Sequence, residues 1–286
     1  METTLFTCMI LEQDDEEPFV QVYWARAVHL GAAIQMILDS ARSNGLRNPV
    51  ARECDPYDIE NLRGEVAPAA SAEVFWSTSQ HFFPPAPLFD LPTGIISSCL
   101  EGDHDKDEIA PGFTMTVDDE GLTTIWANMA QSELFQVYSA LVSVFPEYRV
   151  FWYVLHAHWE DEKEERFLVN EGLSTPAKIL DHLRATWVDS VQNGFVTLTA
   201  YLKEGATNIK ISDHKGICVA TRSQAIAERC ANLLVESGYP EVPELVSIDC
   251  EMHHWHYRLP GSRSKTELAA MLKSSGFVDW VPGSGN

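Results

Sequence analysis

The chain has 286 residues, enough for one large domain or two smaller ones with a sizeable core. Its hydrophobic content of 45% and aromatic content of 10% are typical of a globular protein and exclude a globally disordered chain. The 20 Lys+Arg and 42 Asp+Glu residues give a net charge of −22, which opposes binding to nucleic acid and to anionic membranes. Residues 1–148 hold 6 basic and 24 acidic side chains, a net charge of −18, so the acidity is concentrated in the first half.

The amino-terminal residues carry no basic region before their short apolar run, a pattern that does not predict a secretory signal. The longest apolar stretches are too short to span a bilayer. The six cysteines show no CxxC spacing and therefore predict reduced thiols in a cytoplasmic protein; they are Cys8, Cys54, Cys99, Cys218, Cys230 and Cys250.

The first predicted unit is an acidic α+β unit over residues 1–95. Apolar runs predict strands over 5–11 and 19–27, and helical spacing predicts a helix over 28–46 that ends at Asn44-Gly45. The proline-dense residues 81–92 predict a packed loop or a linker between units, because proline cannot occupy the interior of a strand or helix.

The second predicted unit covers residues 96–286, although a single continuous domain is the alternative. It begins with a hairpin turning at 118–121 and a helix over about 131–145. The later elements, in chain order, are strands from 149–159 and from Arg166, a helix over 174–194, strands over 195–203 and 216–221, a helix over 223–236, a long strand over 244–259 and a last helix capped by Ser264 or Thr266. The pattern predicts an α+β fold of helix-backed antiparallel or mixed sheets, with two ββαβ-type, ferredoxin-like pseudo-repeats.

Histidine-rich strands suggest a metal site. In the stretch EMHHWHYRLP and the residues before it, alternate positions place Cys250, His254 and His256 on one face of a strand. A second HxH pair, His156 and His158, lies in another predicted strand. Thiolate and imidazole both suit zinc, so four histidines could converge on one ion if the two strands were neighbours.

The enzyme hypothesis built on these strands is a metal that polarises a carbonyl or activates water, with Glu160 or Glu251 as base. Against it, the chain lacks the CxxC and HxxxH spacings of structural zinc sites, and aromatic residues interleave the ligands as in a half-buried strand. The simpler interpretation is a structural strand, and we expect no cofactor.

Other motifs give little support for catalysis. Asp213 and His214 are an acid and a base of the kind that catalytic sites use. The sequence has no GxSxG motif to supply a nucleophile and complete a triad, so an Asp-stabilised turn is the better interpretation. The acidic loop at 101–108 resembles a calcium loop only at its start. The phosphate-loop, dinucleotide-binding, HExxH and kinase motifs are absent from the sequence.

We therefore expect a non-enzymatic acidic binding protein of the immunity or inhibitor type, which neutralises a basic partner such as a toxin or nuclease. The alternatives are the metal-dependent enzyme above and an assembly module that pairs sheet edges in an oligomer, with the oligomeric state left open. The contact candidates of the binding hypothesis are all acidic: Glu12, Asp14, Asp15, Glu16, Glu17, Asp55, Asp58, Glu60, Asp103, Asp105 and Asp107.

Overall fold

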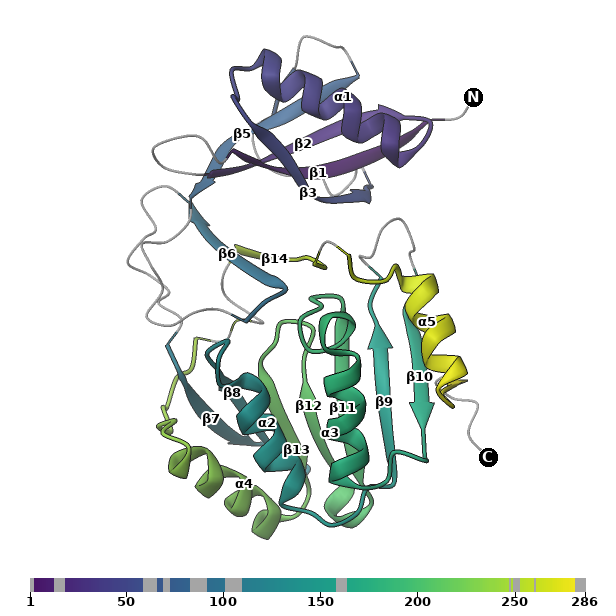
Figure 1. The fold of residues 1–286 in the computed structure, drawn as a ribbon. Helices are drawn as coiled ribbons and strands as arrows, with labels where there is room; N and C mark the ends of the chain where they lie inside the picture. The colour runs from purple at the N-terminus through teal and green to yellow at the C-terminus, as the bar shows by residue number, and fades with distance from the viewer. Residues whose placement is uncertain are drawn as a thin grey trace.

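In the described part of the chain, two antiparallel sheets and five helices build an α+β fold, as the sequence pattern predicts (Figure 1). The computed structural model describes residues 3–12, 19–58, 66–68, 73–82, 92–100, 110–157, 164–246, 248, 253–259 and 261–280. Within these ranges, the side chains of residues 53, 81, 82, 96–100 and 253–255 are not described. No described helix is long and apolar enough to cross a membrane.

Within the described residues, the first sheet has seven strands, six from the first 100 residues and one from residues 253–256. Its order is β14 (His253–His256), β6 (Ile95–Leu100), β5 (Val74–Phe82), β2 (Phe19–Ala27), β1 (Thr4–Glu12) and β3 (Pro49–Pro56), with β4 (Val66–Pro68) paired to β5. The predicted unit boundary at residue 95 falls at the start of β6. The sheet then takes its outer strand, β14, from near the carboxyl end.

Helix α1 (Leu30–Ser43) packs on β1, β2 and β3 of this sheet. The His29 side chain accepts a hydrogen bond from the Ala32 N–H and so begins the helix. The apolar stripe of α1 covers the inward residues of the strands, and together they form a small core that includes Tyr23 and Ile37, both fully buried.

The second sheet has eight strands. Its order is β15 (Val278–Trp280), β10 (Arg166–Asn170), β9 (Val150–Leu155), β11 (Val196–Leu202), β12 (Thr207–Ile211), β13 (Ile217–Thr221), β8 (Thr123–Asn128) and β7 (Gly112–Val117). The predicted hairpin between β7 and β8 is confirmed: the Asp118 carboxylate accepts from the N–H groups of Glu120 and Leu122, and Gly121 adopts the positive φ of the turn.

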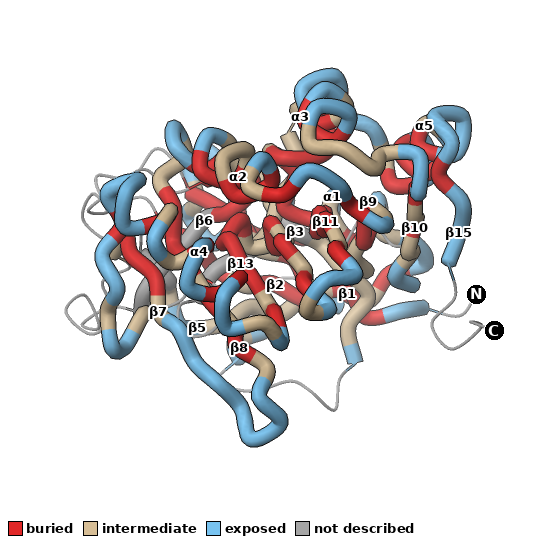
Figure 2. Tube along the Cα trace, turned by 90° about the horizontal axis from the view of Figure 1, so that it is seen from below, coloured by how far each residue is buried: buried red, intermediate tan, exposed pale blue. Residues whose placement is uncertain are grey.

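Four helices lie on one face of the eight-stranded sheet: α2 (Leu134–Ser143), α3 (Pro176–Ala185), α4 (Gln224–Glu236) and α5 (Lys265–Ser274) (Figure 1). They bury the main core, and Figure 2 shows the buried residues concentrated along strands such as β11 and β13 beneath them. Two short 3-10 helices complete the unit, η2 (Trp187–Asp189) and η3 (Glu204–Ala206).

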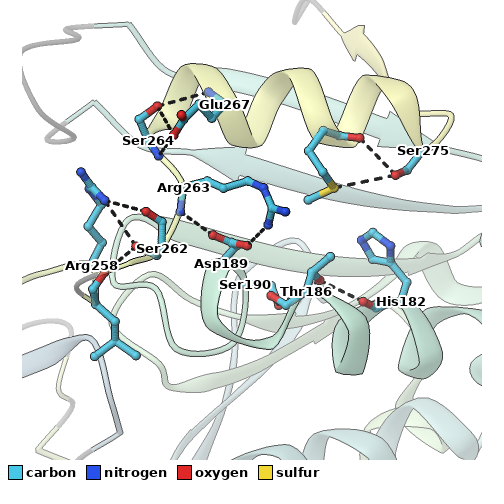
Figure 3. A network of polar contacts seen from close by, with 12 residues as sticks. His182, Thr186, Asp189, Ser190, Arg258, Ser262, Arg263, Ser264, Glu267 and Ser275 are labelled. Atoms are coloured by element: carbon cyan, nitrogen blue, oxygen red, sulfur yellow. Dashed lines mark hydrogen bonds and ion pairs between the residues drawn. The ribbon is translucent and has the colours of Figure 1, made fainter.

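Polar contacts attach the last helix to the body of this unit (Figure 3). The buried Asp189 carboxylate accepts from the Arg263 backbone N–H at 2.7 Å and forms an ion pair with the Arg263 guanidinium. The next residue, Ser264, forms a capping box with Glu267 that begins α5. The predicted cap at Ser264 is therefore confirmed.

The two segments predicted as ββαβ have that order in the structure. In the first, β1 pairs with both β2 and β3; in the second, β9 pairs with both β10 and β11. The predicted helix over 174–194 is too long, because α3 ends at Ala185. There the Thr186 hydroxyl bonds to the His182 carbonyl, and the chain continues as η2.

Two further predictions need correction. Within the described residues, the long strand predicted over 244–259 is the short β14, and it pairs with β6 of the other sheet. The prediction of reduced thiols is wrong for Cys8 and Cys54, which face each other across β1 and β3 and form a disulfide. Cys218 and Cys230 are buried and take no part in this disulfide.

Candidate metal site

The turn between β12 and β13 presents two of the site residues, Asp213 and His214. It is closed by backbone hydrogen bonds from Ser212 N–H to the Gly216 carbonyl, at 2.9 Å, and from Lys215 N–H to the Ser212 carbonyl, at 3.0 Å. Lys215 adopts a positive φ of 63° and is fully buried, with its ammonium 2.9 Å from the Val196 carbonyl. The buried lysine thus fixes the turn against the start of β11.

The third residue, His256, reaches the turn because three stretches of backbone meet closely, at Gly94, Gly194 and Tyr257. Tyr257 N–H donates to the Gly94 carbonyl at 2.9 Å, and Gly194 N–H donates to the Tyr257 carbonyl at 3.1 Å. A Cβ atom on Gly194 would lie 2.2 Å from the Gly94 carbonyl oxygen, so only glycine fits there. This backbone crossing places His256, the last residue of β14, at the end of the eight-stranded sheet.

These three side chains bring one potential ligand atom each within 4.8 Å of the others. The Nε2 atoms of His214 and His256 lie 3.0 Å apart. An Asp213 carboxylate oxygen lies 3.3 Å from His214 Nδ1, and the other lies 3.8 Å from His256 Nδ1. The side chains are 15% to 22% exposed, so water reaches the cluster.

The hydrogen bonds of the two imidazoles determine which nitrogens face each other. His256 Nδ1 bonds to the Gly194 carbonyl, which is only an acceptor, so this nitrogen carries the proton. His214 Nδ1 faces the Asp213 carboxylate and carries its proton for the same reason. In the neutral rings, both Nε2 atoms are then acceptors, and they lie 3.0 Å apart, with the two ring planes at 81° and the ring centroids 4.2 Å apart. Two acceptor nitrogens this close repel each other, and a bound proton or metal ion would relieve that repulsion.

A hydrogen-bonded chain supports Asp213 from the side of β9. The His156 ring bonds to the Glu165 carboxylate at 3.0 Å through Nδ1 and to the Thr197 hydroxyl at 2.8 Å through Nε2. The Thr197 hydroxyl lies 3.4 Å from Asp213, and His156 Nε2 itself lies 3.9 Å from that carboxylate. Such outer contacts hold a ligand carboxylate in one orientation.

The electrostatics of the site favour an ionised carboxylate. Burial by itself raises the pKa of Asp213, but the hydrogen bond from His214 and the charges of the surrounding imidazoles outweigh it and hold that pKa below its usual range. Burial lowers the pKa of Lys215 to about 7, and the Asp213 charge opposes this shift. A carboxylate that stays ionised beside imidazole nitrogens is a suitable environment for a divalent cation.

The predicted histidine ligands meet only in part. Strands β9 and β14 belong to different sheets, yet His156 and His256 both approach Asp213, at 3.9 Å and 3.8 Å. The side chain of His254 lies outside the described residues. The other members of the hypothesis, His158, Cys250, Glu160 and Glu251, also lie outside them. The sequence interpretation missed Asp213 and His214 as ligands, and their adjacency in the DHKG turn was the signal.

The acidic contact candidates are mostly outside the described part of the chain: Asp14, Asp15, Glu16, Glu17, Glu60, Asp103, Asp105 and Asp107. Glu12 is buried, and its carboxylate accepts from the N–H groups of Arg47 and Asn48, so it holds the connection between α1 and β3 and is not at the surface. Asp58 is exposed, and Asp55 is half-buried on β3.

Comparison with known proteins gives no match to a family model, a curated protein or a solved structure.

Proposed function

We propose that the protein binds one divalent transition metal of the zinc class through His214, His256 and Asp213. The observation that carries the proposal is the 3.0 Å approach of the two Nε2 atoms, each with its Nδ1 proton directed at an acceptor. With zinc–nitrogen bonds of about 2.0–2.1 Å, tetrahedral geometry requires a nitrogen–nitrogen separation of about 3.3 Å. Zinc bound by both nitrogens would therefore widen their separation slightly and turn the two rings, whose centroids now lie 4.2 Å apart at an interplanar angle of 81°.

The number of ligands supports a chemical role for the ion. Three protein donors leave at least one coordination position open, as in catalytic zinc sites, whereas structural sites use four. A metal bound there would supply Lewis acidity and would lower the pKa of a bound water. The protein residues would hold and orient the ion: the Gly194 carbonyl directs the His256 ring, and Asp213 would turn from His214 Nδ1 to reach the ion.

Zinc titration of chelator-stripped protein tests the proposal, with bound metal counted by elemental analysis and affinity measured by calorimetry. We expect one zinc per chain and no comparable binding of magnesium, since magnesium prefers oxygen ligands. His214→Asn and His256→Asn should each weaken zinc binding by at least about 100-fold, because each removes a ligand.

The matched control is His29→Asn, which removes an imidazole elsewhere while keeping a residue that caps α1 well. It should bind zinc as the unaltered protein does. Substoichiometric zinc, or equal affinity in all variants, would refute the proposed site.

The charge distribution favours a second function that is compatible with the first: binding of a basic partner, such as a toxin or nuclease, by the acidic first half. Residues 1–148 carry a net charge of −18, and exposed acids among them include Asp39, Asp58 and Glu73. A field of this sign accelerates the encounter with a cationic surface and pairs with its Lys and Arg side chains.

Capture from source cells at low and high salt tests this second function, followed by an affinity measurement with the identified partner. Reversal of residues 14–17 to lysine should weaken binding at low salt by at least about tenfold. The control reverses four exposed acids of the second half, Glu171, Glu204, Glu228 and Glu236. Equal loss in both variants, or binding indifferent to salt, would exclude specific recognition by the acidic half.

A further inference from the structure

We propose that the metal ion at His214, His256 and Asp213 controls the docking of the two sheets on each other. This inference rests on the proposed metal binding, and it states what that binding does to the docking of the two sheets. His256 ends β14 of the seven-stranded sheet, whereas Asp213 and His214 belong to the β12–β13 turn of the eight-stranded sheet. One ion would therefore bind both bodies at once.

The described residues show no shared hydrophobic core between the two sheets. The buried apolar residues of the main cluster all lie within 113–277, and those of the two smaller clusters lie within 6–76. Hydrophobic burial is what normally fixes the relative position of two units in one chain. Among the described residues, the contacts across the junction are polar ones and the packing of the Phe195 ring on His256, at 6.1 Å between centroids.

Those polar contacts gather beside the metal site. The backbone crossing contributes the hydrogen bonds of Tyr257 N–H to Gly94 and of Gly194 N–H to Tyr257. The His256 ring bonds to the Gly194 carbonyl in the same crossing. Figure 1 shows β6 and β14 in the position between the helix-covered sheet and the body that carries α1. The ligand His256 and the crossing are therefore parts of one junction.

The physical consequence follows from linkage. A metal that needs ligands from both bodies binds the docked state and not a state in which β14 has moved away from the β12–β13 turn. At a free zinc concentration of about 100 times the dissociation constant, the ratio of docked to separated molecules rises by about 100-fold. By reciprocity, the apparent dissociation constant for zinc rises in proportion as a change at the crossing lowers the fraction of docked molecules.

Amide hydrogen exchange of the full chain, with zinc and with chelator, tests the inference. In zinc we expect exchange at the Gly194 and Tyr257 amides to slow by at least tenfold, whereas the central amides of α1 and of β12 remain unchanged. The comparison uses the unaltered protein, so it does not depend on a variant that folds. His256→Asn should abolish the effect of zinc, and His29→Asn should retain it.

Two negative results have different meanings. Stoichiometric zinc with unchanged exchange at the crossing, or with equal slowing throughout both sheets, overturns the docking role while the metal site stands. An absence of bound zinc refutes the metal site and the docking role together.

Discussion

His182 gives the most quantitative prediction, a loss of stability in mild acid. Its ring lies on α3 with Nε2 2.9 Å from the Tyr153 hydroxyl, and it packs against the Phe277 ring at 5.3 Å between centroids. Burial lowers the pKa of His182 to about 4 from an ordinary value of 6.5. The folded protein therefore keeps this ring neutral at pH values where the unfolded chain takes up a proton.

The sign and size follow from proton linkage. Between pH 6.5 and 4 the unfolded state binds more protons at this position, so stability falls as the pH falls. The two pKa values give a loss of about 2 kcal/mol between pH 7 and pH 5, and about 3 kcal/mol once the pH is below 4. The neighbouring ionisable groups are the Tyr153 hydroxyl, whose pKa is raised by burial, and Asp189, which is paired with Arg263. The Tyr153 hydroxyl stays neutral throughout this window.

Urea unfolding at pH 7, 6 and 5 measures the effect, with chelator present so that metal binding does not contribute. His182→Gln keeps an acceptor for the Tyr153 hydroxyl but removes the titrating ring. The unaltered protein should lose about 2 kcal/mol more than this variant between pH 7 and pH 5. Parallel pH profiles, or an NMR titration of His182 near pH 6.5, would show that the ring is not held neutral by burial.

The remaining predictions concern the crossing and the last helix. Gly194→Ala should reduce zinc affinity at least tenfold in calorimetry, because a Cβ there collides with the opposite backbone. Gly31→Ala, whose Cβ would meet nothing closer than 3.6 Å on α1, should leave zinc affinity unchanged and stabilise the fold by up to about 1 kcal/mol. Arg263→Ala should lower the free energy of unfolding, measured in urea, by about 2 kcal/mol, because it removes the cation that pairs with the buried Asp189. A loss below about 0.5 kcal/mol would contradict this expectation. Ser264→Ala should cost about 1 kcal/mol in the same assay through loss of the α5 capping box, and no change would mean that the box is not formed in solution.

Local elements of the fold could be predicted from the sequence because local patterns determine them. Strand β2 occupies the predicted residues 19–27, and α4 differs from its prediction by one residue. Strand pairing could not be predicted in the same way. Alternation shows that residues 253–256 form a strand, but it does not reveal that β6 is the partner, since pairing depends on residues far away in the chain. The ferredoxin-like pseudo-repeat stays a prediction.

The sequence indicated some of the residues of the candidate site, but it did not indicate which of them meet in space. His156 and His256 stood out by their HxH spacing, and both lie near Asp213. The turn residues Asp213 and His214 join His256 only through the glycine crossing, a contact between segments that no short motif connects. The Cys8–Cys54 disulfide was missed for the same reason, because the spacing of cysteines does not specify their pairing.

The pairing of β6 with β14 also has a consequence for synthesis on the ribosome. Strand β6 leaves the ribosome long before residues 253–256 are translated, so its outer edge has no native partner for most of translation. An open strand edge is where two nascent chains on one message could pair with each other. A chain truncated after α4 would keep that edge permanently, and we expect it to aggregate even though most of its strands are present.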